Sequence, residues 1–127
     1  MNSFDEALRV IRIEEAWLRE TLDLNSGSFD SAVEVLRNAR GKIVVCGMGK
    51  SGLVARKIAA TLTSTGSPAY FLHPAEGIHG DMGILARGDA ALVLSKSGET
   101  PEIAAMLPAL SRLEIPVVSI TSRRDSV

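Results

Sequence analysis

The sequence has 127 residues, enough for one domain with its own core but not for two. Its 14 basic and 15 acidic side chains leave a formal net charge of −1, which excludes the strongly basic face of a nucleic-acid-binding protein. The 46% of hydrophobic residues excludes a disordered chain, and no apolar run approaches the ~20 residues of a membrane-spanning helix. The N-terminus lacks the pattern of a signal peptide, and the single cysteine, Cys46, cannot form an internal disulfide. We therefore expect a cytoplasmic globular domain.

Two amphipathic helices are predicted before the first strand. Ser3 and Glu6 fit a capping box at the start of the first helix, where apolar residues recur at helical spacing. Residues 25–28 form a polar and glycine-containing cluster that indicates a turn, and the second helix follows it and stops at Gly41. We expect residues 1–41 to form an N-terminal helical segment that either covers a sheet or packs against a partner subunit.

From residue 42 on, strand and helix patterns alternate. Four short apolar runs, typical of strands buried on both faces, occupy residues 43–46, 69–72, 90–94 and 116–120. One helix is predicted after the glycine-rich turn that follows the first run, up to about Thr65, and another from Pro101 to about Leu113. Residues 73–83 are predicted to form an irregular loop. The alternation predicts an α/β domain with a parallel sheet, for which 2-1-3-4 is one common strand order.

The sequence after the last predicted strand indicates an incomplete sheet. Residues 121–126 are typical of a loop with a helix cap, and the sequence ends one residue later. A two-sided α/β sheet would continue with another helix and strand. We therefore expect residues 42–127 to hold part of a larger domain.

The first candidate site is the glycine-rich segment 47–52, which follows a strand and begins a helix. It matches the dinucleotide fingerprint G-x-G-x-x-G, but that interpretation also requires an acid at the end of the second strand, where Glu76 is the nearest. A Walker A loop is excluded because Val44 stands where glycine is needed. The alternative is a tight turn whose glycines only allow close packing. Lys50 and Ser51 at the helix N-terminus favour anion binding instead.

The second candidate site is the segment 95–100, which lies between a strand end and a helix start. Its three hydroxyls and one lysine suit the oxygens of a phosphate monoester. Helix capping would need only one of these hydroxyls. In the 2-1-3-4 order this segment and the glycine-rich turn face one crevice, at the topological switch point where open α/β sheets bind ligands.

The third candidate site is the loop that holds both histidines, His73 and His79, beside Glu76 and Asp81. Histidine and carboxylate suit zinc, but the spacing matches no standard zinc motif. General acid–base catalysis by one histidine is an equal alternative. His73, at a strand end, could also be a structural residue bonded to backbone.

Glu99 and Glu102 lie in or next to the first turn of the helix that follows segment 95–100. Acids at this position commonly compensate the helix dipole. Beside a bound sugar phosphate, one of them could instead move a proton on carbon.

Three segments, GMGKSG, STGSPAYFLHPAEGIHGDMG and SKSGETPEI, together resemble the sugar isomerase (SIS) domain family, and are most similar to its arabinose 5-phosphate isomerases. The resemblance implies a flavodoxin-like three-layer fold. It also implies interconversion of D-ribulose 5-phosphate and D-arabinose 5-phosphate through an enediolate, which feeds 3-deoxy-octulosonate and lipopolysaccharide synthesis. A homo-oligomer, tetramer or dimer, is implied as well, with no required cofactor.

Matched position by position, the resemblance places the catalytic lysine at Lys50, the first catalytic glutamate at Glu102 and a substrate-contacting histidine at His79. In this interpretation Lys50 stabilises the enediolate, while His79 and Glu102 divide ring opening and carbon deprotonation between them. His73 matches a position where some family members hold zinc. The implied substrate-binding residues are Gly49, Ser51, Gly66, Ser67, His79, Ser95, Lys96, Ser97, Gly98 and Thr100.

The sequence departs from the family pattern in three respects. The second catalytic glutamate and second histidine of the family have no counterpart in these 127 residues, and the paired CBS domains of many members are absent. Lys96 stands where asparagine is expected. A non-catalytic module that senses or binds a sugar phosphate is therefore the second hypothesis, although the N-terminal helices lack the basic recognition helix of a transcription regulator.

Overall fold

A computed structural model of the chain describes residues 2–126. The chain divides into two compact units, one that extends to Val33 and one that starts at Glu34. The first unit consists of helix α1 (Ser3–Arg37) up to residue 33. Among residues 2–126, no helix is both long enough and apolar enough to cross a membrane.

The start of α1 differs from the predicted capping box. The side-chain oxygen of Asn2 accepts a hydrogen bond from the backbone N–H of Asp5 at 2.9 Å, so Asn2 caps the helix and Ser3 is its first residue. Glu6 is engaged elsewhere, because its carboxylate forms an ion pair with Arg9 one turn later. The predicted Ser3–Glu6 box is therefore wrong by one residue.

The predicted turn at residues 25–28 is also wrong, because α1 is one helix over Ser3–Arg37 rather than two. The polar side chains that favoured a turn bond to carbonyls of the preceding turn of the same helix. The Asn25 amide donates to the Thr21 carbonyl at 2.7 Å, and the Ser28 hydroxyl donates to the Asn25 carbonyl at 3.2 Å. The helix ends at Arg37, four residues before Gly41.

The second unit is built on the four-stranded parallel sheet that the sequence predicts, in the order β2-β1-β3-β4. Its strands are β1 (Ile43–Gly47), β2 (Ala69–Leu72), β3 (Ala90–Leu94) and β4 (Val117–Ile120). The register aligns the last residues of the strands with one another. We call the edge at these residues the carboxyl edge, and the opposite edge the amino edge.

The helices of this unit are α2 (Gly49–Ser64), α3 (Pro74–Ile78) and α4 (Pro101–Arg112), with a 3-10 helix, η1, at Asp81–Ile84. The predicted irregular loop at residues 73–83 is therefore wrong, since it contains α3 and η1. Pro74 occupies the first turn of α3, where its missing N–H costs nothing. A Cβ on Gly77 would lie 3.5 Å from the Met106 sulfur, so α3 packs closely on α4.

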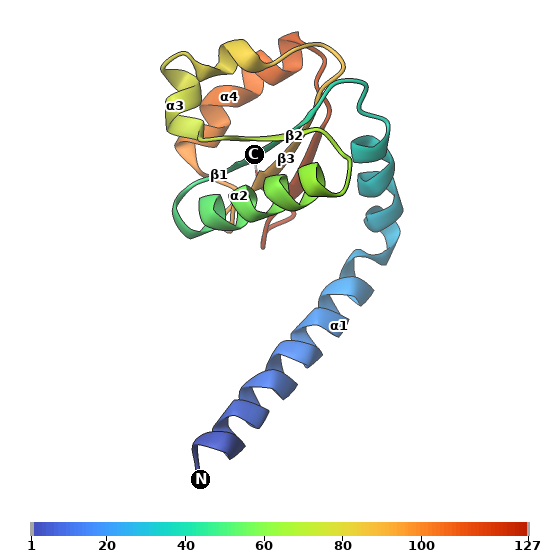
Figure 1. The fold of residues 1–127 in the computed structure, drawn as a ribbon, viewed down its shortest axis with the longest axis vertical. Coiled ribbons are helices and arrows are strands. Elements are labelled where there is room, and N and C mark those ends of the chain that lie inside the picture. The colour runs from blue at the N-terminus through green and yellow to red at the C-terminus, as the bar shows by residue number, and fades with distance from the viewer. Residues whose placement is uncertain (1, 127) are drawn as a thin grey trace. The chain divides into compact units, whose positions relative to one another are not determined.

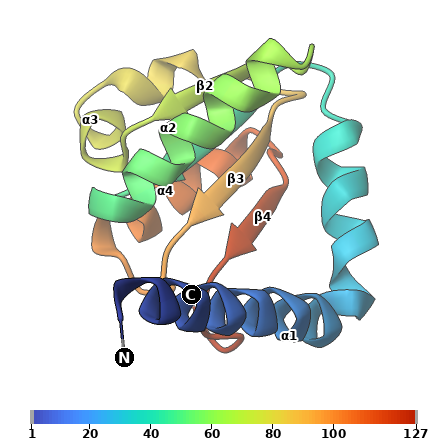
Figure 2. The ribbon, with the colours of Figure 1, turned by 60° about the horizontal axis from the view of Figure 1, so that its bottom comes forward.

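Helices cover both faces of the sheet and give the three-layer α/β fold that was predicted (Figure 1). On one face, Val44 and Val93 pack with Met106 and Leu110 of α4. On the other face α2 packs against the sheet, and Figure 2 shows it in front of the strands, running roughly along them. The apolar residues of that face are Ile43, Val45, Leu92 and Leu94 of the sheet with Ala55 and Ala59 of α2.

Candidate functional site

The carboxyl edge of the sheet carries the candidate site. Because the strands are parallel and in register, the segments that follow β1, β3 and β4 all leave the sheet at this edge. Two adjoining hollows of about 340 and 310 Å³ lie there, a size typical of small-ligand pockets. Together, as the crevice, they are lined by Met48, Lys50, Ser51, Val54, Leu94, Ser95, Lys96, Ser97, Thr100, Ile120, Thr121 and Ser122.

The glycines of the turn after β1 have two different roles. A Cβ on Gly52 would lie 2.7 Å from the Gly47 carbonyl oxygen, so these two glycines let the strand and α2 approach closely. Gly49 instead has a φ of +54° and no heavy atom within 4 Å of where its Cβ would be. Gly47 and Gly52 thus serve close packing, as the second alternative for this segment expects. Lys50 and Ser51 line the crevice at the N-terminus of α2, and anion binding by them stays a prediction.

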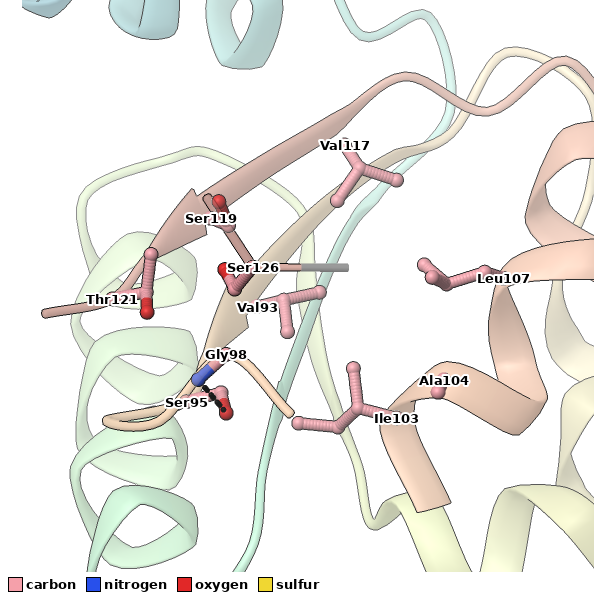
Figure 3. A pocket seen from close by; sticks show the side chains of 10 residues that line it. All are labelled: Val93, Ser95, Gly98, Ile103, Ala104, Leu107, Val117, Ser119, Thr121 and Ser126. Atoms are coloured by element: carbon pink, nitrogen blue, oxygen red, sulfur yellow. Dashed lines mark hydrogen bonds between the residues drawn. The ribbon is translucent and has the colours of Figure 1, made fainter. Parts of the chain in front are cut away.

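The loop at residues 95–100 is shaped by its own hydroxyls. The Ser95 and Thr100 hydroxyls are hydrogen-bonded at 2.8 Å, and the Gly98 N–H donates to the Ser95 hydroxyl at 3.1 Å, the bond drawn in Figure 3. The Glu99 N–H donates to the Ser97 hydroxyl at 3.1 Å. Thr100 is the N-cap residue of α4, yet its hydroxyl does not cap that helix. Helix capping by Thr100 is thereby excluded as the reason for these hydroxyls.

Two polar lining residues, Thr121 and Ser122, were not among the predicted site residues. Both follow β4, and both donate hydrogen bonds to the carbonyl of Lys96 in the loop after β3. The sequence carried a usable signal, because hydroxyl residues follow the third and fourth apolar runs alike, and parallel neighbours end at the same edge.

A separate small cavity of about 50 Å³ lies beside the loop, between α4 and the strands β3 and β4 (Figure 3). Ile103 and Leu107 of α4 face Val93 and Val117 across it. Its volume accommodates only a few water molecules, so it is too small for a sugar phosphate.

The two remaining predicted catalytic residues lie outside the lining of the crevice. His79 is exposed at the C-terminal end of α3, and Glu102 is the second residue of α4. Among residues 2–126, no hydrogen bond or ion pair joins Lys50, His79 and Glu102 to one another. Their roles stay predictions.

Gly66 and Ser67 lie at the amino edge. They precede β2, whose first residue, Ala69, is paired with Ile43 at the start of β1. The structure therefore does not bring these two residues together with the crevice of the same chain. A substrate contact at Gly66 and Ser67 stays a prediction, and it would involve a site other than this crevice.

His73, the predicted zinc ligand, follows β2 and is the N-cap residue of α3, and its ring lies beside that of Phe71. The two rings meet edge to face with centroids 6.3 Å apart, and the buried Nδ1 atom of His73 has no hydrogen-bond partner among the described residues. Within residues 2–126, no three His, Cys, Asp or Glu side chains are gathered so that they could hold a metal ion. The described residues alone thus do not fit a zinc site.

A parallel sheet with a lysine and a hydroxyl-rich loop at its topological switch point defines the class of the chain, an α/β domain with a polar crevice at the carboxyl edge. The family model of the SIS domain matches residues 35–127, and the chain belongs to that family.

The chain is similar to an arabinose 5-phosphate isomerase (KdsD) of Pseudomonas aeruginosa, with 47% identity over 94% of this chain and 37% of that protein. It is also similar to the solved structure of the E. coli CFT073 protein c3406 in complex with arabinose 5-phosphate. That similarity has a TM-score of 0.86 and 39% identity over 99% of this chain and 69% of that one. The phosphoheptose isomerase GmhA of Neisseria gonorrhoeae, at 20% identity and a TM-score of 0.71, shares the fold over 93% of this chain and 76% of its own. The chain thus spans a little over a third of the length of the first curated relative.

Proposed function

We propose that the chain is the substrate-binding part of an aldose–ketose isomerase that interconverts D-arabinose 5-phosphate and D-ribulose 5-phosphate. The observation that carries the proposal is the crevice, in which Lys50 and Ser51 of α2 line the same hollow as Ser95 and Lys96 after β3. The hydroxyls and backbone amides suit the phosphate, and the lysine suits a developing negative charge. The relatives, an arabinose 5-phosphate isomerase and a structure in complex with arabinose 5-phosphate, support the choice of sugar.

The proposed reaction moves one proton between carbons. A base removes the proton from C2 of the open-chain aldose, and the electrons of that bond form the enediolate. A proton then passes from the C2 oxygen to the C1 oxygen, and protonation at C1 yields the ketose with its carbonyl at C2. We assign Glu102 as the base at carbon, Lys50 as the charge that stabilises the enediolate oxygens, and His79 as the group for ring opening and oxygen proton transfer. The resemblance to the family supports these assignments.

The test is turnover by the full-length protein. Arabinose 5-phosphate is supplied and formation of ribulose 5-phosphate is followed. We expect Glu102→Gln to lower kcat by at least about 100-fold, the range that a general base contributes, with little change in sugar-phosphate affinity. Glu99→Gln is the matched control, because Glu99 lies three residues away and is exposed, and it should retain turnover. An unchanged kcat in Glu102→Gln removes Glu102 from the mechanism.

A non-catalytic module that senses or binds a sugar phosphate is the second candidate. The observation that favours it is that His79 and Glu102 do not line the crevice. Binding of arabinose 5-phosphate by the full-length protein without any turnover would establish this second function and reject the isomerase.

We further propose that the protein is a homo-oligomer in the cytoplasm and that its product serves 3-deoxy-octulosonate and lipopolysaccharide synthesis. The exposed apolar side chains of α1 support a second copy as partner. The proposed sugar phosphate and the lone, buried thiol of Cys46 are consistent with a reducing compartment.

A further inference from the structure

The carbonyl oxygen of Lys96 is held by the turn that follows β4. It accepts hydrogen bonds from the Ser122 N–H at 3.0 Å, from the Ser122 hydroxyl, and from the Thr121 hydroxyl at 3.3 Å. The turn is itself fixed, because the Arg123 N–H donates to the Thr121 hydroxyl at 3.2 Å. The Lys96 carbonyl is thus anchored by two adjacent residues that lie 25 and 26 positions later in the sequence.

The anchored carbonyl determines the direction of the next amide. The Lys96 C=O and the Ser97 N–H belong to one peptide unit, and the chain has no cis peptide bond among residues 2–126. In a planar trans peptide the C=O and N–H point in opposite directions. While the Lys96 oxygen points to Ser122, the Ser97 N–H therefore points away from it. Within the described part of the chain, this N–H donates no hydrogen bond, so it is available to a ligand.

The position of Ser122 in the crevice agrees with such a role. Ser122 lines both hollows, as do Ser51 of α2 and Ser95 and Lys96 of the loop after β3. Backbone N–H groups that are preorganised before the ligand arrives donate hydrogen bonds to phosphate oxygens without a cost in conformational reorganisation. A side chain that fixes the direction of one such N–H therefore affects anion affinity without touching the reacting carbons.

We propose that Ser122, assisted by Thr121, is a positioning residue that directs the Ser97 N–H toward the phosphate of the bound sugar. The inference rests on the proposed function, because it assigns the phosphate end of the substrate to the loop at residues 95–100. It adds the turn after β4 to the groups that determine phosphate affinity.

The test compares Ser122→Ala with Ser122→Thr in the full-length protein, and Ser111→Ala, an exposed serine of α4, is the matched control. The readouts are the dissociation constant of inorganic phosphate, the shift of the Ser97 amide resonance on phosphate addition, and KM and kcat for arabinose 5-phosphate. We expect Ser122→Ala to weaken phosphate binding and to raise KM by roughly five-fold, the effect of one hydrogen bond, mainly in KM rather than kcat. Ser122→Thr should restore both constants, and the double variant Thr121→Val/Ser122→Ala should weaken binding further.

A purely structural role gives a different pattern. If Ser122→Ala lowers the unfolding midpoint but leaves the phosphate dissociation constant and KM unchanged, or if Ser122→Thr fails to restore them, the positioning role is rejected while the isomerase stands. If the protein binds phosphate in a Ser122-dependent manner but turns over no sugar, the isomerase is rejected while the positioning role stands. Absence of both phosphate binding and turnover rejects both.

Discussion

At the residue scale, the loop at residues 95–100 depends on hydroxyls that bond to one another before any ligand binds. The side chain of Ser95 is 7% exposed, shares a hydrogen bond with Thr100 and accepts one from the Gly98 N–H. A buried hydroxyl network of this kind costs free energy when it is only partly satisfied. The same pair therefore shapes the loop and presents Thr100 to the crevice.

We predict that Ser95 and Thr100 are energetically coupled. Ser95→Ala and Thr100→Val should each lower the free energy of unfolding by about 1 kcal/mol, and the double variant should cost less than their sum because the shared bond is lost only once. Urea unfolding of the two single variants and the double variant measures the coupling. Strictly additive losses would show that the bond between the two hydroxyls contributes nothing.

A second residue-scale feature is the buried carboxylate of Asp89 at the amino edge, away from the crevice. It is 2% exposed and accepts hydrogen bonds from the Lys42 ammonium at 2.8 Å, the Lys42 N–H at 3.0 Å and the Ala86 N–H at 2.9 Å. Burial acts to raise the pKa of Asp89, but these hydrogen bonds and the positive charge of Lys42 together hold it below its usual value. The ionised carboxylate is therefore the form that the fold stabilises.

We predict that Asp89→Asn lowers the free energy of unfolding by about 3 kcal/mol at pH 7, because the half-buried Lys42 ammonium loses its charge partner. The pKa in the folded state is depressed, so the contribution of Asp89 is complete above the unfolded-state pKa of about 4 and is lost as the pH falls through the folded-state value. The difference between wild type and Asp89→Asn should therefore shrink below pH 4. Urea unfolding at pH 7 and pH 3 tests this, and a constant difference would contradict the assigned charge state.

At the element scale, the turn between β1 and α2 allows no side chain at Gly52, because the backbones of the two elements are in close contact there. A Cβ on Gly52 would lie 2.7 Å from the Gly47 oxygen and 3.3 Å from its carbonyl carbon, and both are backbone atoms that cannot rotate away. We predict that Gly52→Ala lowers the free energy of unfolding by about 2 kcal/mol, within the usual range for overpacking.

Gly27→Ala is the matched control for the glycine turn. Gly27 lies inside α1 with no heavy atom within 4 Å of the position that a Cβ would take, and alanine is the better helix former by about 1 kcal/mol. Thermal unfolding should therefore show a lower midpoint for Gly52→Ala and an equal or higher one for Gly27→Ala. Equal midpoints for the two variants would mean that the close approach at Gly47 does not constrain the fold.

Elements differ in how far the sequence alone predicts them. The strands were predicted well because continuous apolar runs such as residues 90–94 are too short for a typical helix. The alternation indicates a parallel sheet but not the order of its strands, for which 2-1-3-4 is a common order and is the order found. The turn expected at residues 25–28 was wrong because serine and asparagine bond to a preceding helical turn as readily as they form turns. Residues 73–83 fold into α3 and η1 through packing on α4, which no local pattern encodes.

Site residues were predictable where their place in the sequence, just after a strand, put them at the carboxyl edge. They were not predictable where their contacts depend on which residues of neighbouring strands are paired. Ser95 follows β3 directly, and Lys50 and Ser51 lie in the first turn of α2 shortly after β1, so the topology alone placed them in one crevice. Thr121 and Ser122 were missed because their contact with Lys96 depends on which residues of β3 and β4 are paired. Gly66 and Ser67 are assigned by resemblance, and the sheet places them at the opposite edge.

At the scale of the whole molecule, α1 presents apolar side chains that its own unit does not bury. None of its residues is buried, although Phe4, Ile11 and Leu18 recur every seven positions and Leu22 and Phe29 extend the same face. A seven-residue apolar repeat is the pattern with which helices pack along one another. Exposed apolar surface of this extent marks an interaction site, and a second copy of the chain offers the same pattern in return.

We therefore predict that Leu22→Lys halves the mass of the protein in solution, because it places a charge within the apolar face of α1. Asp23→Lys, the adjacent position on the polar side of the same helix, introduces the same side chain and should leave the mass unchanged. Light scattering of the full-length protein over a range of concentrations measures both variants. Isomerase turnover measured in parallel then shows whether the crevice acts within one subunit: retained activity in a dissociated Leu22→Lys variant assigns the reaction to a single chain, whereas loss of activity places part of the site on the partner subunit. Two variants of unchanged mass would contradict self-association through α1.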